Sequence, residues 1–512
     1  MSPRPLLFFS VATIVGCSLI TDVDGLRSQA DAQAPTDGGN ADQATVDAGN
    51  DASPTDPSWT FTLPAKSLFN AVAVDPSGNV YVAGSLSAPL TLGSISIPST
   101  QGEDVFVMKL DGTTKQPVWA KIFGGTGDDV AKSLVYESGS LLLVGQTTST
   151  TLLFGGTNVV IPASTSSADV YGFLAKVDPT DGSAVWAISP DTMRGAGTSH
   201  TTFCSSLAAK GTTIVIACAY NGAKFGYQIA AFDTATNYGL GILRFKDGGI
   251  SPPQQTWGKS LTPGFINPVV TLDDAGDILV AAGVGGITQV IDQEKSAVAV
   301  TGVGTKANLY VLRITDATQV VSSAKAWATD SGGLLPPYFT GITARGTDVV
   351  AVGQLFGTGS FGKTPLTSAG GFDGLLLRLN SALDTQAQFA YGGASFDTVA
   401  GVATDGKGNS YIGMNWSSTG ISLAATKTLP APPAGSPNLA CALGKIDAAG
   451  KVTTLPAMTS QSATVRFLDV KLDATSKIYA VGTFGGATTF DDGSTVTATL
   501  TGSGFLLRRA PF

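Results

Sequence analysis

The sequence predicts an all-β fold, a seven-bladed β-propeller of four-stranded antiparallel blades. Three observations favour this class. One strand phrase recurs seven times at a nearly constant interval, a hairpin phrase precedes each copy, and helical periodicity is absent. Glycine is abundant, with 63 of 512 residues, and charged residues make up 13%. That composition excludes coiled coils and helical bundles, which need many Glu and Lys residues.

A short strand phrase marks the seven repeats. It has an apolar residue on each side of a basic one, as in DVFVMKLD, YGFLAKVD and GLLLRLN. Successive basic residues lie 63 to 69 positions apart; they are Lys109, Lys176, Arg244, Arg313, Arg378, Lys445 and Arg508. We expect each to pair with an aspartate or a carbonyl group within its own blade. A ring of cations that binds an anion is the alternative.

Two further phrases complete four strands per repeat, named A to D in chain order. Two apolar stretches joined by a turn come before each basic strand, as in FNAVAVDPSGNVYVAGS from Phe69 to Ser85. A tryptophan strand follows the basic strand in several copies, at Trp119, Trp186, Trp257 and Trp327, and Phe389 takes this place in the fifth. Four antiparallel strands repeated seven times are typical of a propeller.

The two ends of the repeat region predict how the ring closes. The seventh repeat has strands A, B and C before Phe512, and a tryptophan strand around Trp59 precedes the first repeat. Pairing of that strand with the last repeat would complete the seventh blade and remove two open sheet edges. The propeller should therefore span residues 59–512, with Trp59 sharing one blade position with the four tryptophans above.

The repeat phrases resemble those of the seven-bladed β-propeller repeat (SBBP) family. The family phrase D-x-x-G-N-x-Y-V-x-G is matched from Asp75 to Gly84, and D-x-F-V-x-K-L-D from Asp104 to Asp111. The resemblance covers about residues 59–512. It implies the fold and no reaction.

The N-terminus has the features of an export signal. Arg4 precedes an apolar run from Leu6 to Gly16, which is too short to span a bilayer. Ile14-Val15-Gly16-Cys17 resembles the bacterial lipobox, in which the cysteine carries the lipid. Residues 1–17 are therefore predicted to be a lipoprotein signal peptide. The resemblance implies a lipid anchor on Cys17 in the cell envelope, at the outer membrane because residue 18 is not Asp.

An acidic, low-complexity segment follows the signal. Residues 18–58 hold eight Asp and one basic residue, Arg27, with few aromatic side chains. Such a segment buries too little apolar surface to fold, so we expect a disordered linker between the lipid and the propeller.

The composition argues against several kinds of site. The net charge of −8 excludes a nucleic-acid binder, and a multi-histidine metal site is impossible with His200 alone. Gly357 to Gly362 matches G-x-G-x-x-G, but no helix follows, so we assign it to a hairpin rather than to a dinucleotide loop. The D-x-x-G segments are interpreted as turns rather than calcium loops. No catalytic residue, metal or cofactor is predicted.

The cysteines of the folded region have two predicted states. Cys204 and Cys218 flank a turn centred near Gly211 and would face each other across a hairpin, so we expect a disulfide after export. Cys441 lies in an apolar strand and should be a buried thiol.

The candidate binding surface is one face of the ring. Each repeat has a long connection between strands B and C, and the D-to-A links include FGGTGDD and YGGASFD. Both kinds of loop lie on the same face of a propeller, and loops on a rigid scaffold often carry function. We expect a monomeric, non-enzymatic binding or interaction module with a glycan or protein ligand. A carbohydrate-active hydrolase or lyase with paired aspartates, and a purely structural envelope protein, stay open as alternatives.

Overall fold

The computed structural model describes residues 46–47 and 58–512, apart from 64–65, 99–101, 160–168, 192–200, 222, 229–231, 234–238, 262–264, 285–288, 291–299, 302–306, 331–336, 363, 425–426, 433–438 and 461–462. The regular elements of these residues are all β-strands. In the part of the chain so described, no helix has the length and apolarity needed to cross a bilayer.

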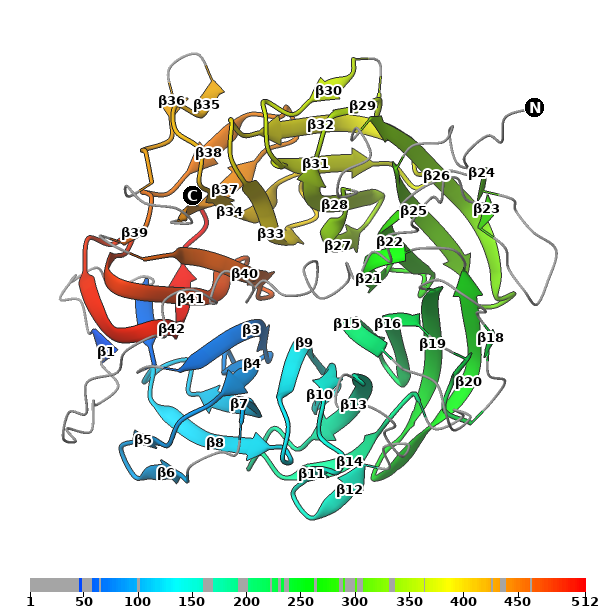
Figure 1. Ribbon diagram of the computed structural model, residues 1–512, viewed down its shortest axis with the longest axis vertical. Coiled ribbons are helices and arrows are strands. Elements are labelled where there is room, and N and C mark those ends of the chain that lie inside the picture. The colour runs from blue at the N-terminus through cyan, green and yellow to red at the C-terminus, as the bar shows by residue number, and fades with distance from the viewer. Residues whose placement is uncertain are drawn as a thin grey trace, which may run out of the picture. The chain divides into compact units, whose positions relative to one another are not determined.

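Seven antiparallel sheets follow one another around a ring, each with strand A innermost (Figure 1). Blades 1 and 2 are β3 (Ser67–Val74), β4 (Val80–Leu86), β7 (Asp104–Leu110) and β8 (Pro117–Phe123), then β9 (Asp129–Glu137), β10 (Ser140–Thr147), β13 (Tyr171–Val177) and β14 (Ala184–Ile188). Blades 3 and 4 are β15 (Thr201–Lys210), β16 (Thr213–Asn221), β19 (Gly239–Gly248) and β20 (Ser251–Leu261), then β21 (Phe265–Leu272), β22 (Ile278–Val284), β25 (Ala307–Thr315) and β26 (Val320–Asp330).

The other three blades have the same order of strands. Blades 5 and 6 are β27 (Phe339–Arg345), β28 (Asp348–Leu355), β31 (Asp373–Leu379) and β32 (Thr385–Tyr391), then β33 (Asp397–Thr404), β34 (Ser410–Trp416), β37 (Ala440–Ile446) and β38 (Val452–Thr454). Blade 7 is β40 (Val465–Leu472), β41 (Ile478–Thr489), β42 (Thr495–Arg509) and β2 (Trp59–Thr62), with the short strands β39 (Thr459–Ser460) and β1 (Val46–Asp47) in the same sheet. The predicted seven-bladed propeller is confirmed.

The N-terminal strand closes the ring, as predicted. Strand β2 pairs with β42 so that Trp59 lies opposite Arg508. The neighbouring Arg509, which is buried, donates hydrogen bonds to the Trp59 carbonyl (2.6 Å) and the Thr60 hydroxyl (2.9 Å) and forms an ion pair with Asp491. Strand β1, within the segment predicted to be a linker, pairs with the outer side of β2. Backbone pairing and the buried Arg509 together hold the two ends of the described propeller in one sheet.

Hydrophobic packing between blades forms the core. The buried apolar side chains of the described residues fall into clusters, each built from the facing sides of two successive blades. The cluster between blades 7 and 1 includes Phe61, Phe69 and Tyr479, so the closing strand contributes to it directly. Because every blade has two such neighbours, the removal of one blade would expose two apolar surfaces.

A β-bulge recurs in strand A of each blade, opposite a small residue near the end of strand B. In blade 1 the register shifts between Phe69 and Ala71, and Gly84 lies opposite Phe69. A β-carbon built on Gly84 would lie 1.8 Å from the Leu68 carbonyl oxygen, so the bulge requires glycine there. Blade 3 differs, because the residues that face each other at the bulge are Cys204 and Cys218.

The tryptophans occupy one blade position in four of the five predicted cases. Trp119, Trp186, Trp257 and Trp59 each lie opposite the basic residue of strand C. The prediction is wrong for Trp327, which lies opposite Leu309, and Phe389 likewise lies opposite Leu376 rather than Arg378. Trp119 lies ten positions after Lys109, but Trp327 lies fourteen positions after Arg313. The β25–β26 turn does not contain all of the additional residues, so Trp327 lies further along strand D, opposite Leu309.

Candidate functional site

The antiparallel order of strands gives the propeller two different faces. The turn face carries the short A–B and C–D turns, such as residues 75–79 and 111–116. The loop face carries the B–C connections and the D–A links, such as residues 124–128 and 392–396. The predicted lipidation residue Cys17 and His200 lie outside the described residues.

Aspartates on the turn face cap their own turns. The Asp75 carboxylate accepts hydrogen bonds from the backbone N–H groups of Ser77 and Asn79, both at 2.9 Å, and from the Tyr81 hydroxyl at 3.0 Å. Asp273, Asp405 and Asp473 accept the same two backbone bonds in their blades. The interpretation of the D-x-x-G segments as turns is confirmed, since these bonds are those of an Asx-turn.

The predicted partners of the basic residues of strand C are wrong in most blades, because these side chains reach into the next blade. Lys176 Nζ lies 2.7 Å from Asp247 Oδ2 and 3.0 Å from the Gly249 carbonyl oxygen, both in the C–D turn of blade 3. Arg244 binds Asp316 of blade 4 through two nitrogens. The basic side chain leaves strand C on the sheet face that packs against the next blade, whose C–D turn is therefore nearest.

We call the contact between a basic residue of strand C and the next blade a clasp. In other blades the clasp has a carbonyl oxygen as its acceptor. Lys109 Nζ donates to the Pro179 carbonyl of blade 2 (3.2 Å), and Lys445 Nζ donates to the Phe512 carbonyl beyond blade 7 (2.6 Å). Arg378 donates to the Gly408 carbonyl and the Ser410 hydroxyl of blade 6. Arg508 contacts Tyr479 of its own blade. The described basic residues thus have structural partners, which argues against a free anion-binding ring.

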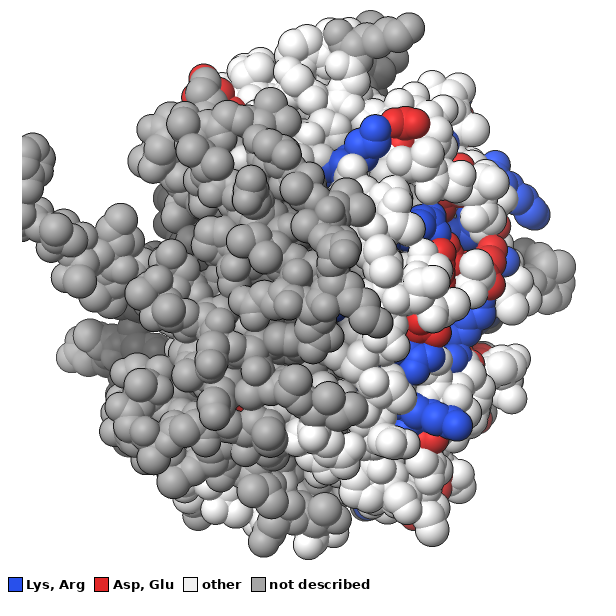
Figure 2. Space-filling view, turned by 90° about the vertical axis from the view of Figure 1, so that its right-hand side faces the viewer, with Lys and Arg blue, Asp and Glu red and all other residues white. Residues whose placement is uncertain are grey.

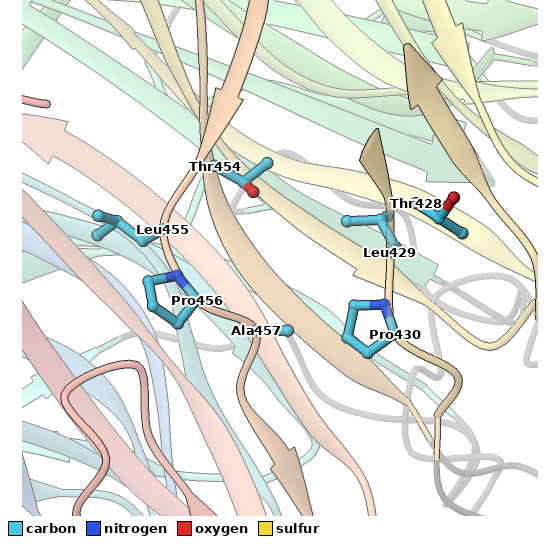
Figure 3. Close-up of a pocket in the computed structure, with 7 residues that line it drawn as sticks. All are labelled: Thr428, Leu429, Pro430, Thr454, Leu455, Pro456 and Ala457. Carbon is cyan, nitrogen blue, oxygen red and sulfur yellow. The ribbon is translucent and has the colours of Figure 1, made fainter. Parts of the chain in front are cut away.

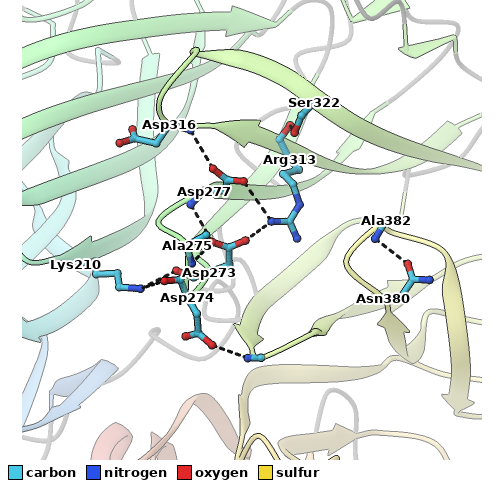
Figure 4. Close-up of polar contacts among 11 residues, drawn as sticks. Lys210, Asp273, Asp274, Ala275, Asp277, Arg313, Asp316, Ser322, Asn380 and Ala382 are labelled. Carbon is cyan, nitrogen blue, oxygen red and sulfur yellow. Dashed lines mark hydrogen bonds and ion pairs between the residues drawn. The ribbon is translucent and has the colours of Figure 1, made fainter.

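In blade 4 the basic residue of strand C pairs within its own blade, as predicted. Arg313 forms ion pairs with Asp273 and Asp277, both of the same blade (Figure 4). The inter-blade contact is made instead by Lys325 of strand D, which lies 2.7 Å from Asp384 of blade 5. The A–B turns of blades 3 and 4 are joined as well, because Lys210 at the end of β15 donates hydrogen bonds to the carbonyls of Asp273 and Asp274 (Figure 4).

These contacts pair several of the charged side chains on the turn face. Basic and acidic side chains adjoin one another along one side of the view in Figure 2, where few stand alone. Charges that are paired in this way, between and within blades, offer little uncompensated potential to a charged ligand.

On the loop face, two D–A links bury an aspartate in equivalent ways. Asp129 accepts hydrogen bonds from the Gly125 N–H (2.8 Å) and from the hydroxyl groups of Thr147 and Ser149. Asp397 accepts bonds from the Gly393 N–H (2.8 Å) and the Ser418 hydroxyl (2.6 Å). Both aspartates are fully buried. The sequences FGGTGDD and YGGASFD therefore encode the same cap at two blade borders.

A second buried aspartate lies beside each of these caps, at the start of strand C. Asp104 and Asp373 are 6% and 4% exposed, and the Oδ1 atom of each is buried without a hydrogen-bond partner. A β-carbon on Gly124 would lie 1.9 Å from Asp104 Oδ1, and one on Gly392 would lie 2.2 Å from Asp373 Oδ1. The first glycine of each G-G pair thus makes room for a carboxyl group.

Burial changes the acidity of these four groups. Desolvation raises the pKa of Asp129 to about 6 despite its hydrogen bonds, and the nearby Asp104 adds to the rise. Desolvation likewise raises the pKa of Asp373 to about 6, with a further contribution from Asp397. The pKa values of Asp104 and Asp397 are also raised, chiefly by burial. Each border therefore holds two carboxyls that disfavour simultaneous ionisation.

The two pairs do not have the arrangement of a glycosidase. A general acid or a nucleophile must contact the substrate, and all four carboxyls are covered by protein. They lie at blade borders, between strand C of one blade and strand A of the next, rather than in a central cleft. Their hydrogen bonds to the links make them positioning groups for the loop face.

Small hairpins project from the B–C connections, as predicted. They are β5 (Leu90–Leu92) with β6 (Ile95–Ile97), β11 (Leu152–Phe154) with β12 (Thr157–Val159), β17 (Ala223–Phe225) with β18 (Phe232–Asp233), β23 (Gln289–Val290) with β24 (Val300–Thr301), β29 (Thr358–Gly359) with β30 (Leu366–Thr367), and β35 (Ser422–Ala424) with β36 (Lys427–Thr428). In blade 7, β41 and β42 themselves extend into the hairpin.

One apolar residue anchors several of these hairpins. Phe154 is fully buried and stacks on Phe123 of the preceding blade, with ring centroids 4.7 Å apart. Phe361 is buried in the same way against Trp327 of the preceding blade, at 6.1 Å. Strand β29 also pairs with β26 of blade 4. This places the G-x-G-x-x-G match in a hairpin, as interpreted from the sequence. The hairpins that carry Phe154 and Phe361 are thus fixed to the ring.

The structure pairs the cysteines as the sequence suggests. Cys204 and Cys218 are directly opposite each other in β15 and β16 and are joined as a disulfide. Cys441 is a buried free thiol whose pKa is raised, chiefly by burial. Neither site offers an exposed, acidic thiol for chemistry.

A shallow apolar pocket lies beside the outer strand of blade 6 (Figure 3). It is lined by Thr428, Leu429, Pro430, Thr454, Leu455, Pro456 and Ala457. The Trp416 indole N–H donates to the Pro430 carbonyl (3.0 Å) and fixes one wall. The lining contains no titratable group, so the pocket could hold an apolar group but could not perform acid–base chemistry.

Comparison with known proteins finds solved structures that are similar to this chain at low identity, but no family. No protein-family model and no curated protein matches the chain. The β-propeller domain of the trilobed protease from Pyrococcus furiosus is 7% identical over 87% of this chain and 94% of that chain, with a TM-score of 0.38. Quinohemoprotein alcohol dehydrogenase from Comamonas testosteroni is 12% identical over 89% and 77%, with a TM-score of 0.41.

A third similar structure is a sialidase. The Trypanosoma rangeli sialidase in complex with the inhibitor DANA is 7% identical over 73% of this chain, with a TM-score of 0.37. The matched part spans 54% of that sialidase, or about half its length. At such identities and TM-scores, none of the three structures assigns an activity to this chain.

Proposed function

We propose that the protein is a non-enzymatic binding module displayed on the bacterial cell envelope, with the loop face as its binding surface. The observation that carries this proposal is the difference between the two faces. Several charges on the turn face form pairs that join the blades, such as Lys176 with Asp247. The loop face instead carries hairpins held by buried anchors such as Phe154, which leave other side chains, such as Leu153, exposed.

The N-terminal segments support the envelope location. The lipobox-like Ile14-Val15-Gly16-Cys17 and the acidic residues 18–58 would tether the propeller to a membrane, at the outer membrane by the absence of Asp at residue 18. The repeat phrases support membership of the SBBP repeat family. A monomer is proposed, because ring closure pairs the strand edges within one chain.

Burial of the carboxylate pairs favours binding over catalysis. The sequence left open a carbohydrate-active enzyme with paired aspartates, but Asp129 and Asp397 are fully buried. We therefore place the binding role first and keep the enzyme and the structural protein as the alternatives that the experiment must separate.

A binding experiment on the full chain tests the proposal. Polysaccharide and protein fractions of the producing cell envelope are titrated against the wild type and against variants in which one described B–C hairpin is replaced by a Gly-Ser linker. Ile250→Lys is the matched control, because Ile250 is 87% exposed in a C–D turn on the turn face. Weaker binding in at least one hairpin variant, with the control unchanged, supports the proposal. Binding that all variants retain, or that the control loses, contradicts it, and product formation from a bound polysaccharide would favour the enzyme.

A further inference from the structure

One aromatic side chain on the loop face is exposed without a structural reason. The described large apolar residues that are exposed are Val118, Leu153, Ile250 and Phe396. Phe396, in the D–A link between blades 5 and 6, is 62% exposed. Its ring stacks on Phe372 with centroids 5.8 Å apart, and Phe372 contacts Phe356 at 5.1 Å. We call these three residues the Phe396 platform.

The backbone that carries Phe396 is held tightly. Its N–H donates to the Ser417 hydroxyl (3.0 Å), and its carbonyl accepts bonds from the N–H (2.9 Å) and the hydroxyl (2.8 Å) of the same serine. Gly371 packs so closely against this link that a β-carbon there would lie 2.0 Å from the Ser395 carbonyl oxygen. A ring on such a support loses little conformational freedom when it binds, which favours affinity.

The equivalent link between blades 1 and 2 shows that this scaffold does not need an aromatic ring. The Asp129 N–H donates to the Glu103 carbonyl (2.6 Å), as the Asp397 N–H donates to the Phe372 carbonyl (2.7 Å). Asp128 stands where Phe396 stands, and its carbonyl likewise accepts a backbone bond from the next B–C connection. The same backbone thus carries two acidic side chains at one border and two phenylalanines at the other.

We infer that the Phe396 platform is a subsite that stacks one face of a neutral pyranose ring, so that the ligand of the loop face is a neutral polysaccharide. This inference rests on the proposed binding function. Phe372 covers one side of the Phe396 ring, and the other side offers a flat apolar surface the size of one sugar ring. The carboxyl groups of Asp373 and Asp397 lie directly after the two stacked phenylalanines, and negative charge on either of them, when ionised, disfavours an anionic sugar.

A protein partner fits this surface less well. A stable protein interface buries roughly 1,200–2,000 Å² in total, with a cluster of apolar anchors at its centre. The other exposed apolar residues of the described chain belong to blades 1, 2 and 3, so none of them extends the platform. One isolated, rigid ring is better matched to the C–H face of a single sugar.

The test titrates the full chain with cellohexaose, laminarihexaose, mannohexaose and chitohexaose, with oligogalacturonate as the anionic comparison. Phe396→Asp copies the residue that the chain uses at the equivalent link, so it should fold. We expect wild-type protein to bind at least one neutral oligosaccharide, Phe396→Asp to weaken that binding by at least about tenfold, and Phe396→Trp to retain it. Ile250→Ala, on the turn face, should have no effect. Equal melting temperatures of the variants serve as the folding control.

Four results would overturn the inference. Neutral oligosaccharide binding that Phe396→Asp leaves unchanged would place the sugar elsewhere, while the proposed binding function would stand. Tighter binding of oligogalacturonate than of every neutral oligosaccharide would contradict a neutral polysaccharide as the ligand, and so would no binding of any of the five. The titration with envelope fractions would then test the binding function separately. A dimer of the wild type that Phe396→Asp dissociates would assign the platform to a contact between two copies.

Discussion

Lys176 of blade 2 lies 2.7 Å from Asp247 of blade 3, so the recurring basic residue of one repeat finds its ionic partner in the C–D turn of the next. Both side chains are largely buried, at 10% and 16% exposure. The ammonium group also donates to the Gly249 carbonyl, which satisfies a second of its protons. Contacts of this kind join successive blades on the turn face, in addition to the apolar packing between the sheets.

We predict that this clasp contributes measurably to the stability of the ring. Lys176→Met keeps the aliphatic stem but leaves Asp247 without its partner, so it should lower the free energy of unfolding by about 2–4 kcal/mol. The double variant Lys176→Met/Asp247→Asn should recover part of the loss. Lys325→Met is the control, because Lys325 and Asp384 also join two blades but are exposed, and it should leave the urea midpoint unchanged. Equal effects of the two single variants would contradict a role for the buried clasp.

The buried carboxyl pairs predict a pH dependence. Asp373 has a pKa of about 6 in the folded protein and an ordinary value of 3.8, so the folded state binds more protons between pH 4 and 6. The free energy of unfolding should therefore fall as pH rises through this window. Asp373→Asn should remove this contribution and be more stable than wild type at pH 7, by on the order of 1–2 kcal/mol, with the difference shrinking toward pH 4.5 and disappearing only below the ordinary pKa of 3.8.

Urea unfolding of both proteins from pH 4.5 to 7.5 measures this difference. Asp181→Asn is the control, because the hydrogen bond from Ser183 lowers the pKa of Asp181 and moves its titration below the window. A difference between wild type and Asp373→Asn that stays constant with pH would show that Asp373 does not titrate there.

The disulfide of blade 3 predicts a redox-sensitive stability. The bond closes a loop with a sequence separation of 14, for which about 2–3 kcal/mol of stabilisation is expected. Two thiols should become available for alkylation only after reduction, and Cys441 only after unfolding, which mass spectrometry can count. The double variant Cys204→Phe/Cys218→Gly installs the Phe–Gly pair found at the bulges of blades 1, 5 and 7 and should recover much of the stability lost by Cys204→Ala/Cys218→Ala. A wild type that is equally stable with and without a reductant would contradict the prediction.

The envelope anchor gives a fourth prediction. Cys17→Ala should abolish incorporation of labelled lipid and release the protein from the membrane fraction, because the thiol is the proposed point of attachment. Ser18→Asp is the complementary variant and should move the lipidated protein from the outer to the inner membrane fraction. Unchanged membrane association of Cys17→Ala would rule out the lipid anchor.

Much of the fold follows from local features of the sequence. The repeat interval, the D-x-x-G turns and the spare strand at Trp59 each depend on residues close together in the chain or on simple repetition, and the structure confirms them. The tryptophan register was predicted less well. It assumed equal C–D turns, and the fourteen-residue spacing from Arg313 to Trp327 violates that assumption.

The site could be located by face but not by residue. The sequence assigned the basic residues to partners in their own blade, because the twist that turns Lys176 toward Asp247 of the next blade is a property of the packed ring. Phe396 and Asp128 occupy equivalent places in two similar segments, and their exposure depends on packing against the neighbouring loops. Arg509 was overlooked beside the predicted Arg508, although its spacing from Asp491 across the last hairpin is a signal that could have identified it.

The most direct test of the binding face is hydrogen–deuterium exchange of the full chain with and without the envelope polysaccharide fraction. We predict slower exchange in peptides of the loop face, above all in residues 392–397 and in the B–C hairpins, because a bound ligand would cover these segments and stabilise their local hydrogen bonds. Peptides of the A–B and C–D turns should exchange at unchanged rates. Protection confined to those turns, or none under conditions in which the polysaccharide is shown to bind, would contradict the assignment of the loop face as the binding surface.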